Sequence, residues 1–562
     1  MKRLTLILGI ILLLSLSMGI GHAGQRIANA LAALPSHSRT ALINNAGAPS
    51  SNYVLVAWSE LGMHCIDGKD YSIFSVLPPY NVIHAQLFKK GEPPVPLTSG
   101  VTITYQAVAD TSGSVNSSSG SKTNFWTYIK ALFLVSLPPE TGLAGYKTQG
   151  KVPQAMTFNA TEGYWEGVGI PTVPYDDKGK FNPYPMAQIV AKDSTGKVLA
   201  TSKIVLSVSD ELTCNQCHGS NTDPNAMPAT GWVNNPDPAK DTKLNILKKH
   251  DDRWDVKPYL SQLQAAGYNY KTTLYQTATS GTPVLCAACH SDNALGVPGI
   301  SPIASLSSDM HSLHGPQILL SNGLTLDQNS ATSDLNSCYL CHPGPATQCK
   351  RGAMNAVLCS ECHGDLSQVS DPNRDPWFIE PSCQMCHNSS QRYTSAFDSN
   401  GQWRQTSDTA FATNDNVPLQ GANLYRFSLG HGSVFCSACH GSPHAEFPTL
   451  QKNDNVYPTG LQKYAAKITE CTVCHTNALA ATPNGGPHGL HKVGQSWVNA
   501  HGNYVESHGS QACTYCHATD YRGLALSETK VQRVFSTENG QQTFSAGHQF
   551  NCYDCHNGPN GG

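Results

Sequence analysis

The pattern of hydrophobic and polar residues changes near residue 210. Before that point, strand-like segments follow one another, such as the alternating run 101–105. The segments 187–192 and 198–208 flank the turn Asp193-Ser194-Thr195-Gly196, which is typical of a β-hairpin. Short strands separated by turns over about 160 residues predict an immunoglobulin-like β-sandwich domain over residues 52–210.

From residue 211 to residue 562, apolar residues become sparse, and loops rich in Gly, Pro, Asn and Ser alternate with short helical stretches. One helix is predicted after Asp241 or Thr242, either of which can cap it. A second is predicted over about 258–266, ending at Gly267. The pattern indicates a region of little secondary structure whose apolar residues are too few for an ordinary core.

The first 23 residues predict an export signal. Lys2 and Arg3 precede an apolar run over 4–20, and Gly21-His22-Ala23 is a suitable cleavage site. A membrane anchor is the alternative, because the run is near the lower limit for a span. Residues 24–51 read as a leader or linker. We therefore expect an exported protein, periplasmic or at the cell surface, with no membrane span in its mature form.

One pattern, Cys-x-x-Cys-His, occurs nine times after residue 211. Its two thiols lie on one face of a helical turn and can add to the vinyl groups of a haem, and the His can bind the iron. With 20 Cys and 23 His in 562 residues, chance predicts about 0.03 matches. Zinc knuckles are the alternative, but zinc gives no reason for a His after every second Cys.

The sequence therefore predicts nine covalently bound haem c groups, whose macrocycles supply the apolar mass that the chain lacks. The attachment cysteines are Cys214, Cys217, Cys286, Cys289, Cys338, Cys341, Cys359, Cys362, Cys383, Cys386, Cys436, Cys439, Cys471, Cys474, Cys513, Cys516, Cys552 and Cys555. The proximal iron ligands are His218, His290, His342, His363, His387, His440, His475, His517 and His556. Only Cys65 and Cys349 remain, as a disulfide or as buried thiols.

The ligand in the second axial position of each iron determines whether the haem transfers electrons or binds and converts a substrate. Few methionines are present to compete, so we expect mostly bis-His haems of low potential. The candidate distal ligands are His250, His311, His314, His431, His444, His488, His491, His501, His508 and His548. Two further candidates, His64 and His84, lie in the predicted β domain.

Three motifs begin at Cys338, Cys359 and Cys383, separated by 21 and 24 residues with no spare His among them. We expect their macrocycles to lie close together and to draw distal ligands from elsewhere in the sequence. The candidates are His311, His314, His64 and His84.

The segment 61–70 concentrates soft and polar side chains in the β domain. His64 and Cys65, with His84, could form a metal site, or His64 could bind a haem iron. Asp67 and Asp70 could instead form a calcium loop. A turn with a buried Cys65 is the plainer alternative.

Net charge is −3 and charged residues make up 13% of the chain. Because there is no basic patch, we exclude nucleic acid as a partner.

The nine motifs and the phrase His-Gly-x-x-x-Cys-x-x-Cys-His-Gly resemble the exported multihaem c-type cytochromes of metal- and sulfur-respiring bacteria. The resemblance covers about residues 212–562, and 62–65 with 77–81 resemble a β domain found beside such regions. It implies a carrier of electrons to or from redox partner proteins or extracellular acceptors, with no catalytic residue. The alternatives are a reductase of a small nitrogen or sulfur compound at one open haem, and a subunit of a conductive filament. The nitrite-reducing type usually has a Cys-x-x-Cys-Lys motif, which is absent here.

Overall fold

The computed structural model describes residues 52–388, 391–404, 424–431, 433–476, 491, 494–518, 520–523, 527–529 and 531–559. The chain divides into two units, 1–51 and 52–562, and all described residues belong to the second. The predicted export signal and linker, and the candidate ligand His488, lie outside the described residues.

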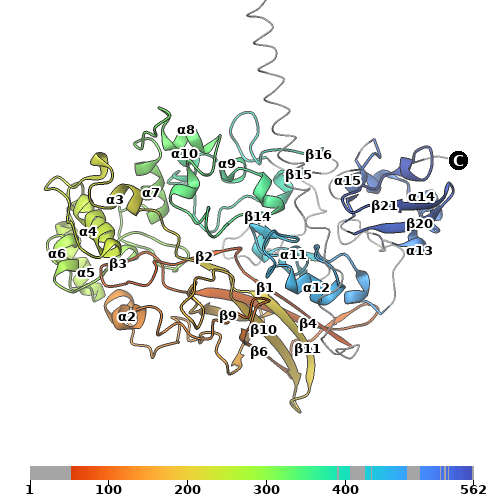
Figure 1. Ribbon diagram of the computed structural model, residues 1–562, viewed down its shortest axis with the longest axis horizontal. Helices are drawn as coiled ribbons and strands as arrows, with labels where there is room; N and C mark the ends of the chain where they lie inside the picture. Colours follow the sequence, from red (N-terminus) through yellow and green to blue (C-terminus); the bar gives the residue numbers. More distant parts are fainter. Residues whose placement is uncertain are drawn as a thin grey trace, which may run out of the picture. The chain divides into compact units, whose positions relative to one another are not determined.

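Two antiparallel sheets form the β domain (Figure 1). The first sheet has the order β1 (Tyr53–Ser59), β4 (Asn81–Lys89), β9 (Tyr164–Ile170) and β8 (Thr157–Asn159), with β5 (Val95–Pro96) paired to β4. The second has the order β11 (Val198–Val205), β10 (Met186–Asp193), β6 (Val101–Val108) and β7 (Gln154–Ala155). The prediction of a β domain followed by a region of little secondary structure is confirmed.

The core of the β domain lies between these sheets. β10 alternates buried and partly exposed residues, as expected for a strand with one face on a core, and it forms the predicted hairpin with β11. Gly196 closes the turn with φ of 85°, a conformation that favours glycine. Leu55 and Ile83 from the first sheet pack in one cluster with Ile189 from the second.

The helices after residue 210 are short. The predicted N-cap of the first long helix is wrong. The N-cap of α4 (Pro238–Asp251) is Asp237, whose side chain accepts hydrogen bonds from two backbone N–H groups. Asp241 instead lies buried and accepts from Ser220. The second predicted helix is η2 (Lys257–Tyr259) followed by α5 (Leu260–Ala266), and it ends at Gly267 as predicted. The other helices outside the Cys-x-x-Cys-His motifs are α2 (Phe125–Phe133), η1 (Pro224–Ala226), α6 (Leu274–Thr279), α7 (Leu306–His314), α8 (Leu326–Ser330), η5 (Ala353–Ala356), α10 (Leu366–Val369), η7 (Tyr425–Phe427), α12 (Val456–Gln462), α13 (Gln495–Val498) and α14 (His501–His508).

Small two-stranded sheets connect the remaining segments. The parallel pairs are β2 (His64–Cys65) with β12 (Val208–Ser209), β3 (Phe74–Ser75) with β13 (Val284–Leu285), and β14 (Arg351–Gly352) with β19 (Ala445–Glu446). The antiparallel pairs are β15 (His387–Asn388) with β16 (Gln391–Arg392), β17 (Leu429–His431) with β18 (Val434–Phe435), and β20 (Arg533–Thr537) with β21 (Gly540–Phe544).

A buried arginine joins the β domain to the motif region. Arg351 is 2% exposed, and its Nε donates to Asp454 Oδ2 at 2.6 Å. The same guanidinium donates to Gly62 O at 2.6 Å and to Ser207 Oγ at 2.9 Å, both in the β domain. Because a buried guanidinium needs all these acceptors, the contact fixes one arrangement of the two regions.

Among the residues that the structure describes, no helix has the length and apolar character needed to cross a bilayer.

Candidate functional site

Each Cys-x-x-Cys-His motif forms one helical turn. In the first, His218 N donates to Cys214 O at 2.8 Å, and in the third, His342 N donates to Cys338 O at 2.8 Å. Such a turn brings the thiols and the imidazole to one side of the backbone. The turns are α3 (Asn215–His218), η3 (Cys286–Ala288), η4 (Cys338–Leu340), α9 (Cys359–His363), η6 (Cys383–Met385), α11 (Cys436–His440), η8 (Cys471–Val473), η9 (Gln511–Cys513) with α15 (Thr514–His517), and η11 (Cys552–Asp554).

Six motif histidines each face a histidine from outside the motifs. All twelve residues are among the predicted proximal and distal ligands. The ring-centre separations are 6.4 Å for His218–His314, 6.1 Å for His342–His311, 5.9 Å for His363–His444, 5.9 Å for His475–His431, 6.2 Å for His517–His491 and 5.8 Å for His556–His501.

These separations fit two imidazoles on opposite sides of one metal ion. Metal–imidazole bonds are about 2.0–2.1 Å long in zinc sites and the ring centre lies about 1 Å beyond the nitrogen, so the two ring centres would be about 6 Å apart. In one pair the ring nitrogens also face each other, with His501 Nε2 and His556 Nε2 3.5 Å apart. The residues present therefore fit a haem iron with two axial histidines.

Hydrogen bonds at Nδ1 orient several of these rings. A carbonyl oxygen only accepts, so Nδ1 carries the proton and Nε2 keeps the lone pair that binds a metal. The Nδ1 partners are Ser307 O for His311 (2.7 Å), Met310 O for His314 (2.7 Å), Val498 O for His501 (2.8 Å) and Phe550 O for His517 (2.7 Å). His475 Nδ1 instead donates to the carboxylate of Glu92, at 2.9 Å.

Burial favours the neutral form of several of these imidazoles, including His218, His250 and His363, and the neutral form is the one that binds metals. Burial, together with the neighbouring His314, lowers the pKa of His218 to about 4. Burial lowers the pKa of His363 to about 3, with the neighbouring His444 adding to the effect. Burial, together with His290 of the second motif, lowers the pKa of His250 to about 4, so these two predicted ligands are neighbours as well.

His548 has a different kind of partner from the other candidate distal ligands. Its Nε2 lies 2.8 Å from Asp554 Oδ2 rather than facing a motif histidine, although the spacing before Cys552 placed it among the candidate ligands. The side chains of His387, His508 and Cys516 lie outside the described residues. His440 ends α11, which packs against β1 of the β domain.

The acidic residues of the segment 61–70 accept hydrogen bonds from neighbouring protein groups. Asp67 accepts from Ser75 Oγ at 2.6 Å and from the N–H of Val76 at 2.8 Å, and Asp70 accepts from Asn124 Nδ2 at 2.5 Å. These bonds occupy the carboxylates that the calcium alternative requires.

The thiols left outside the motifs do not form the disulfide that was considered. Cys65 and Cys349 are both free thiols. Cys349 Sγ lies 3.9 Å from Nδ1 of His444.

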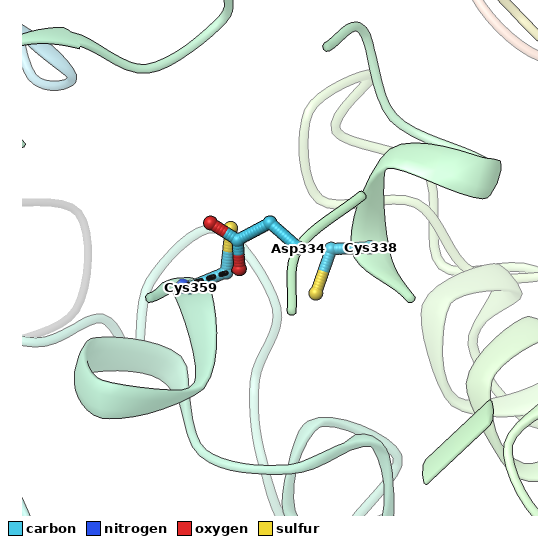
Figure 2. Close-up of side chains that lie close together, drawn as sticks. All are labelled: Asp334, Cys338 and Cys359. Atoms are coloured by element: carbon cyan, nitrogen blue, oxygen red, sulfur yellow. Dashed lines mark hydrogen bonds between the residues drawn. The ribbon is translucent and has the colours of Figure 1, made fainter. Parts of the chain in front are cut away.

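Two neighbouring motifs meet at their first cysteines (Figure 2). The sulfur atoms of Cys338 and Cys359 and a carboxylate oxygen of Asp334 lie within 4.8 Å of one another. Asp334 accepts from the backbone N–H of Cys359 at 2.9 Å and forms a buried ion pair with Lys350. Because both sulfurs belong to Cys-x-x-Cys-His motifs and Lys350 offsets the carboxylate charge, a separate metal ion here is the weaker interpretation.

Thiols of other motifs are neighbours too. Burial, together with a thiol from another motif, raises the pKa of Cys341 to about 12 and that of Cys439 to about 12. Since such effects fall with distance, they identify adjacent motifs. The interacting pairs are Cys341 with Cys214, Cys362 with Cys386, Cys383 with Cys436, Cys439 with Cys474, and Cys552 with Cys513.

Several turns present two thiols and an imidazole, and a second imidazole faces the first. This arrangement places the protein in the class whose residues fit several c-type haems. A family model described as outer membrane cytochrome MtrC/MtrF-like, domains II/IV, matches residues 351–560. This match supports a multihaem cytochrome of extracellular electron transfer. No curated protein and no solved structure matches the chain significantly.

Three charged residues that support the site were not among the predicted site residues. Asp334, Lys350 and Arg351 are buried charged residues of the motif region. The sequence does contain a local signal: Lys350 and Arg351 are two adjacent charges in a region poor in charge. Their acceptors come from distant segments, so the sequence did not reveal their roles.

Proposed function

We propose that this protein carries electrons along nine covalently attached, mostly bis-His haems, between redox partners outside the cytoplasm. The observation that carries the proposal is the set of six motif histidines that each face a second imidazole at 5.8–6.4 Å. An iron bound on both sides has no position for a substrate, so such a site favours electron transfer over chemistry.

The haems would supply one-electron redox chemistry, and the chain would hold, orient and space them. Nδ1 hydrogen bonds to backbone carbonyls fix the planes of His311, His314, His501 and His517. Burial lowers the pKa of His218, His311 and His363, so these imidazoles keep their lone pairs available at neutral pH.

Spacing supports conduction from motif to motif. The first cysteines of the third and fourth motifs approach within 4.8 Å, so macrocycles attached there would be in contact at their edges. The other thiol neighbours link the first motif to the third, and the fourth through the seventh in order. Because electron tunnelling falls steeply with distance, a set of adjacent haems would behave as one conductor.

The family match supports an exported, cell-surface location for this activity. An acceptor outside the cell, or a partner protein at the outer membrane, is the class of partner that fits.

The test is to produce the protein in a host that exports it and attaches haem, then measure haem per chain by mass and absorbance. We expect nine haems, mostly low-spin ferric signals in magnetic resonance, and reversible redox titration at low potential. Replacing Cys552 and Cys555 with Ser should leave eight haems and serves as the control for counting. Several high-spin irons together with turnover of a nitrogen or sulfur oxyanion would favour a reductase instead, and filaments in electron micrographs would favour the filament subunit.

A further inference from the structure

Helix α7 carries a candidate distal ligand for each of two motifs. His311 lies in its last turn, and the ring centre of this residue is 6.1 Å from that of His342 in the third motif. Three residues later, the ring centre of His314 is 6.4 Å from that of His218 in the first motif. Nδ1 of His311 and Nδ1 of His314 each donate to a carbonyl oxygen of the helix at 2.7 Å, which orients both rings. The first and third motifs therefore depend on the position of this one helix.

The N-terminal end of α7 is attached to the second motif. Leu306 N donates to the carbonyl oxygen of Ser291, the residue that follows His290, at 3.2 Å. Nδ1 of His290 lies 3.1 Å from the carbonyl oxygen of Ala304, two residues before the helix begins. These contacts fix the start of the helix against the second motif, while its last turn faces the first and third motifs.

A carboxylate of α7 lies beside the same imidazole. Asp309 Oδ2 is 3.1 Å from Nδ1 of His290. Asp309 N donates to Ser305 O at 3.0 Å in the first turn of the helix, so the backbone at Asp309 is held in place. The side chain of His290 is 17% exposed and that of Asp309 is 45% exposed. Solvent therefore weakens this interaction without removing it.

The charge beside Nδ1 matters because of the proton that this nitrogen carries. A carbonyl oxygen only accepts, so Nδ1 of His290 donates to Ala304 O and Nε2 keeps the lone pair that binds a metal. A negative charge next to the N–H group makes the ring a stronger donor and favours the more oxidised state of a bound iron. An acidic residue in the first turn also stabilises a helix through the helix dipole, so an experiment has to separate the two roles of Asp309.

We propose that Asp309 is a positioning residue for the haem of the second motif, and that its carboxylate lowers the potential of that haem. The inference rests on the proposed function, since it needs a haem bound at His290. One short helix would then serve three haems. It would act on two of them through distal imidazoles and on the third through a charge beside the proximal imidazole.

The test uses the full-length holoprotein with Asp309→Asn, which keeps an oxygen acceptor and removes the charge. We expect nine haems per chain and a rise in the potential of one of them. The rise should be up to a tenfold change in preference between the two oxidation states, which is about 59 mV for one electron. Redox titration measures the shift, and ferric magnetic resonance should show one altered low-spin signal. Asp309→Glu keeps the charge and should lie closer to the wild type.

Two further variants locate the effect. Asp255→Asn is the matched control, because Asp255 is an exposed aspartate of the same region that accepts from the N–H of Lys257. It removes the same charge and should raise no potential. Cys286→Ser with Cys289→Ser removes the second haem, and in this background Asp309→Asn should raise no remaining potential.

Nine unchanged potentials in Asp309→Asn would overturn this inference and leave the proposed function intact. A lower unfolding temperature in that case would assign Asp309 to the stability of the helix alone. A shift that persists without the second haem would overturn the assignment to that motif. A wild-type protein without haem would instead end the proposed function itself.

Discussion

The β domain and the motif region bury their side chains in different ways. The β domain packs aliphatic and aromatic residues between two sheets, with Leu55, Ile83, Ile103 and Ile189 at most 1% exposed. Between residues 301 and 423, the described part of the chain buries only three hydrophobic residues, Leu326, Leu366 and Ala396. The same stretch contains three of the nine motifs.

The difference shows where each region obtains its stability. The two sheets bury apolar side chains against each other, which stabilises the β domain by about 25 cal/mol per Å² of apolar surface buried. Phe435, Tyr457 and Val473 of the motif region belong to the same cluster. Between residues 211 and 300 the motif region has an apolar cluster that includes Leu244, Leu263 and Leu274. Over 301–423 the described residues have short turns and paired imidazoles in place of such a core, so we expect the folding of this stretch to depend on the groups that those residues bind. Figure 1 shows the contrast between the long strands β1, β4, β10 and β11 and the short helices of the motif region.

The largest effect should come from preventing haem attachment. If the chain is produced in a cytoplasm without the attachment machinery, we expect proteases to digest residues 211–559 rapidly, while fragments of 52–210 persist. Limited proteolysis with mass spectrometry measures this. Equal resistance of the two regions would contradict the comparison.

The next largest effect concerns the contact between the regions. Asp454→Ala leaves the buried guanidinium of Arg351 without its carboxylate, which should cost about 3–5 kcal/mol of stability. Guanidinium unfolding followed by circular dichroism measures the loss. The double variant Arg351→Met with Asp454→Leu is the control and should recover most of it, because no unpaired charge remains. A loss as large in the double variant would show that packing, not charge, holds the regions together.

A smaller effect should come from Glu92, a β-domain residue whose carboxylate accepts from His475 Nδ1. A carboxylate makes the imidazole a stronger donor to ferric iron than a carbonyl does. Glu92→Gln should therefore raise the potential of one haem. A tenfold change in preference between the two oxidation states corresponds to about 59 mV for one electron, and we expect a shift up to that size. Redox titration measures this shift, with Glu162→Gln as a β-domain control. An unchanged set of potentials would show that Glu92 does not tune the haem potential.

The smallest effect should come from a surface ion pair. Arg533 Nη2 lies 3.3 Å from Glu470 Oε1, next to the seventh motif, and both side chains are partly exposed. Arg533→Gln should change stability by about 0–1 kcal/mol, with less effect at high salt. Thermal unfolding at two salt concentrations measures it. A loss above that range would mean that the pair holds the C-terminal hairpin β20–β21 in place.

Much of the fold followed from local patterns. The hairpin of β10 and β11 and the end of α5 at Gly267 were predicted because turn chemistry acts over a few residues. The N-cap of α4 was predicted at Asp241, four residues after the actual cap, Asp237. Asp237, followed by Pro238, is an equally good local signal, so local pattern alone did not separate the two.

The sequence by itself determined the chemistry. Two thiols and an imidazole within five residues predict an attachment site whatever surrounds them, because the turn that aligns them is local. Only the tertiary structure decided which second imidazole faces the motif histidine in six of the motifs. His363 meets His444, for example, through a contact that links distant segments. Such pairs depend on how long loops close and how strands pair, which a linear pattern does not record.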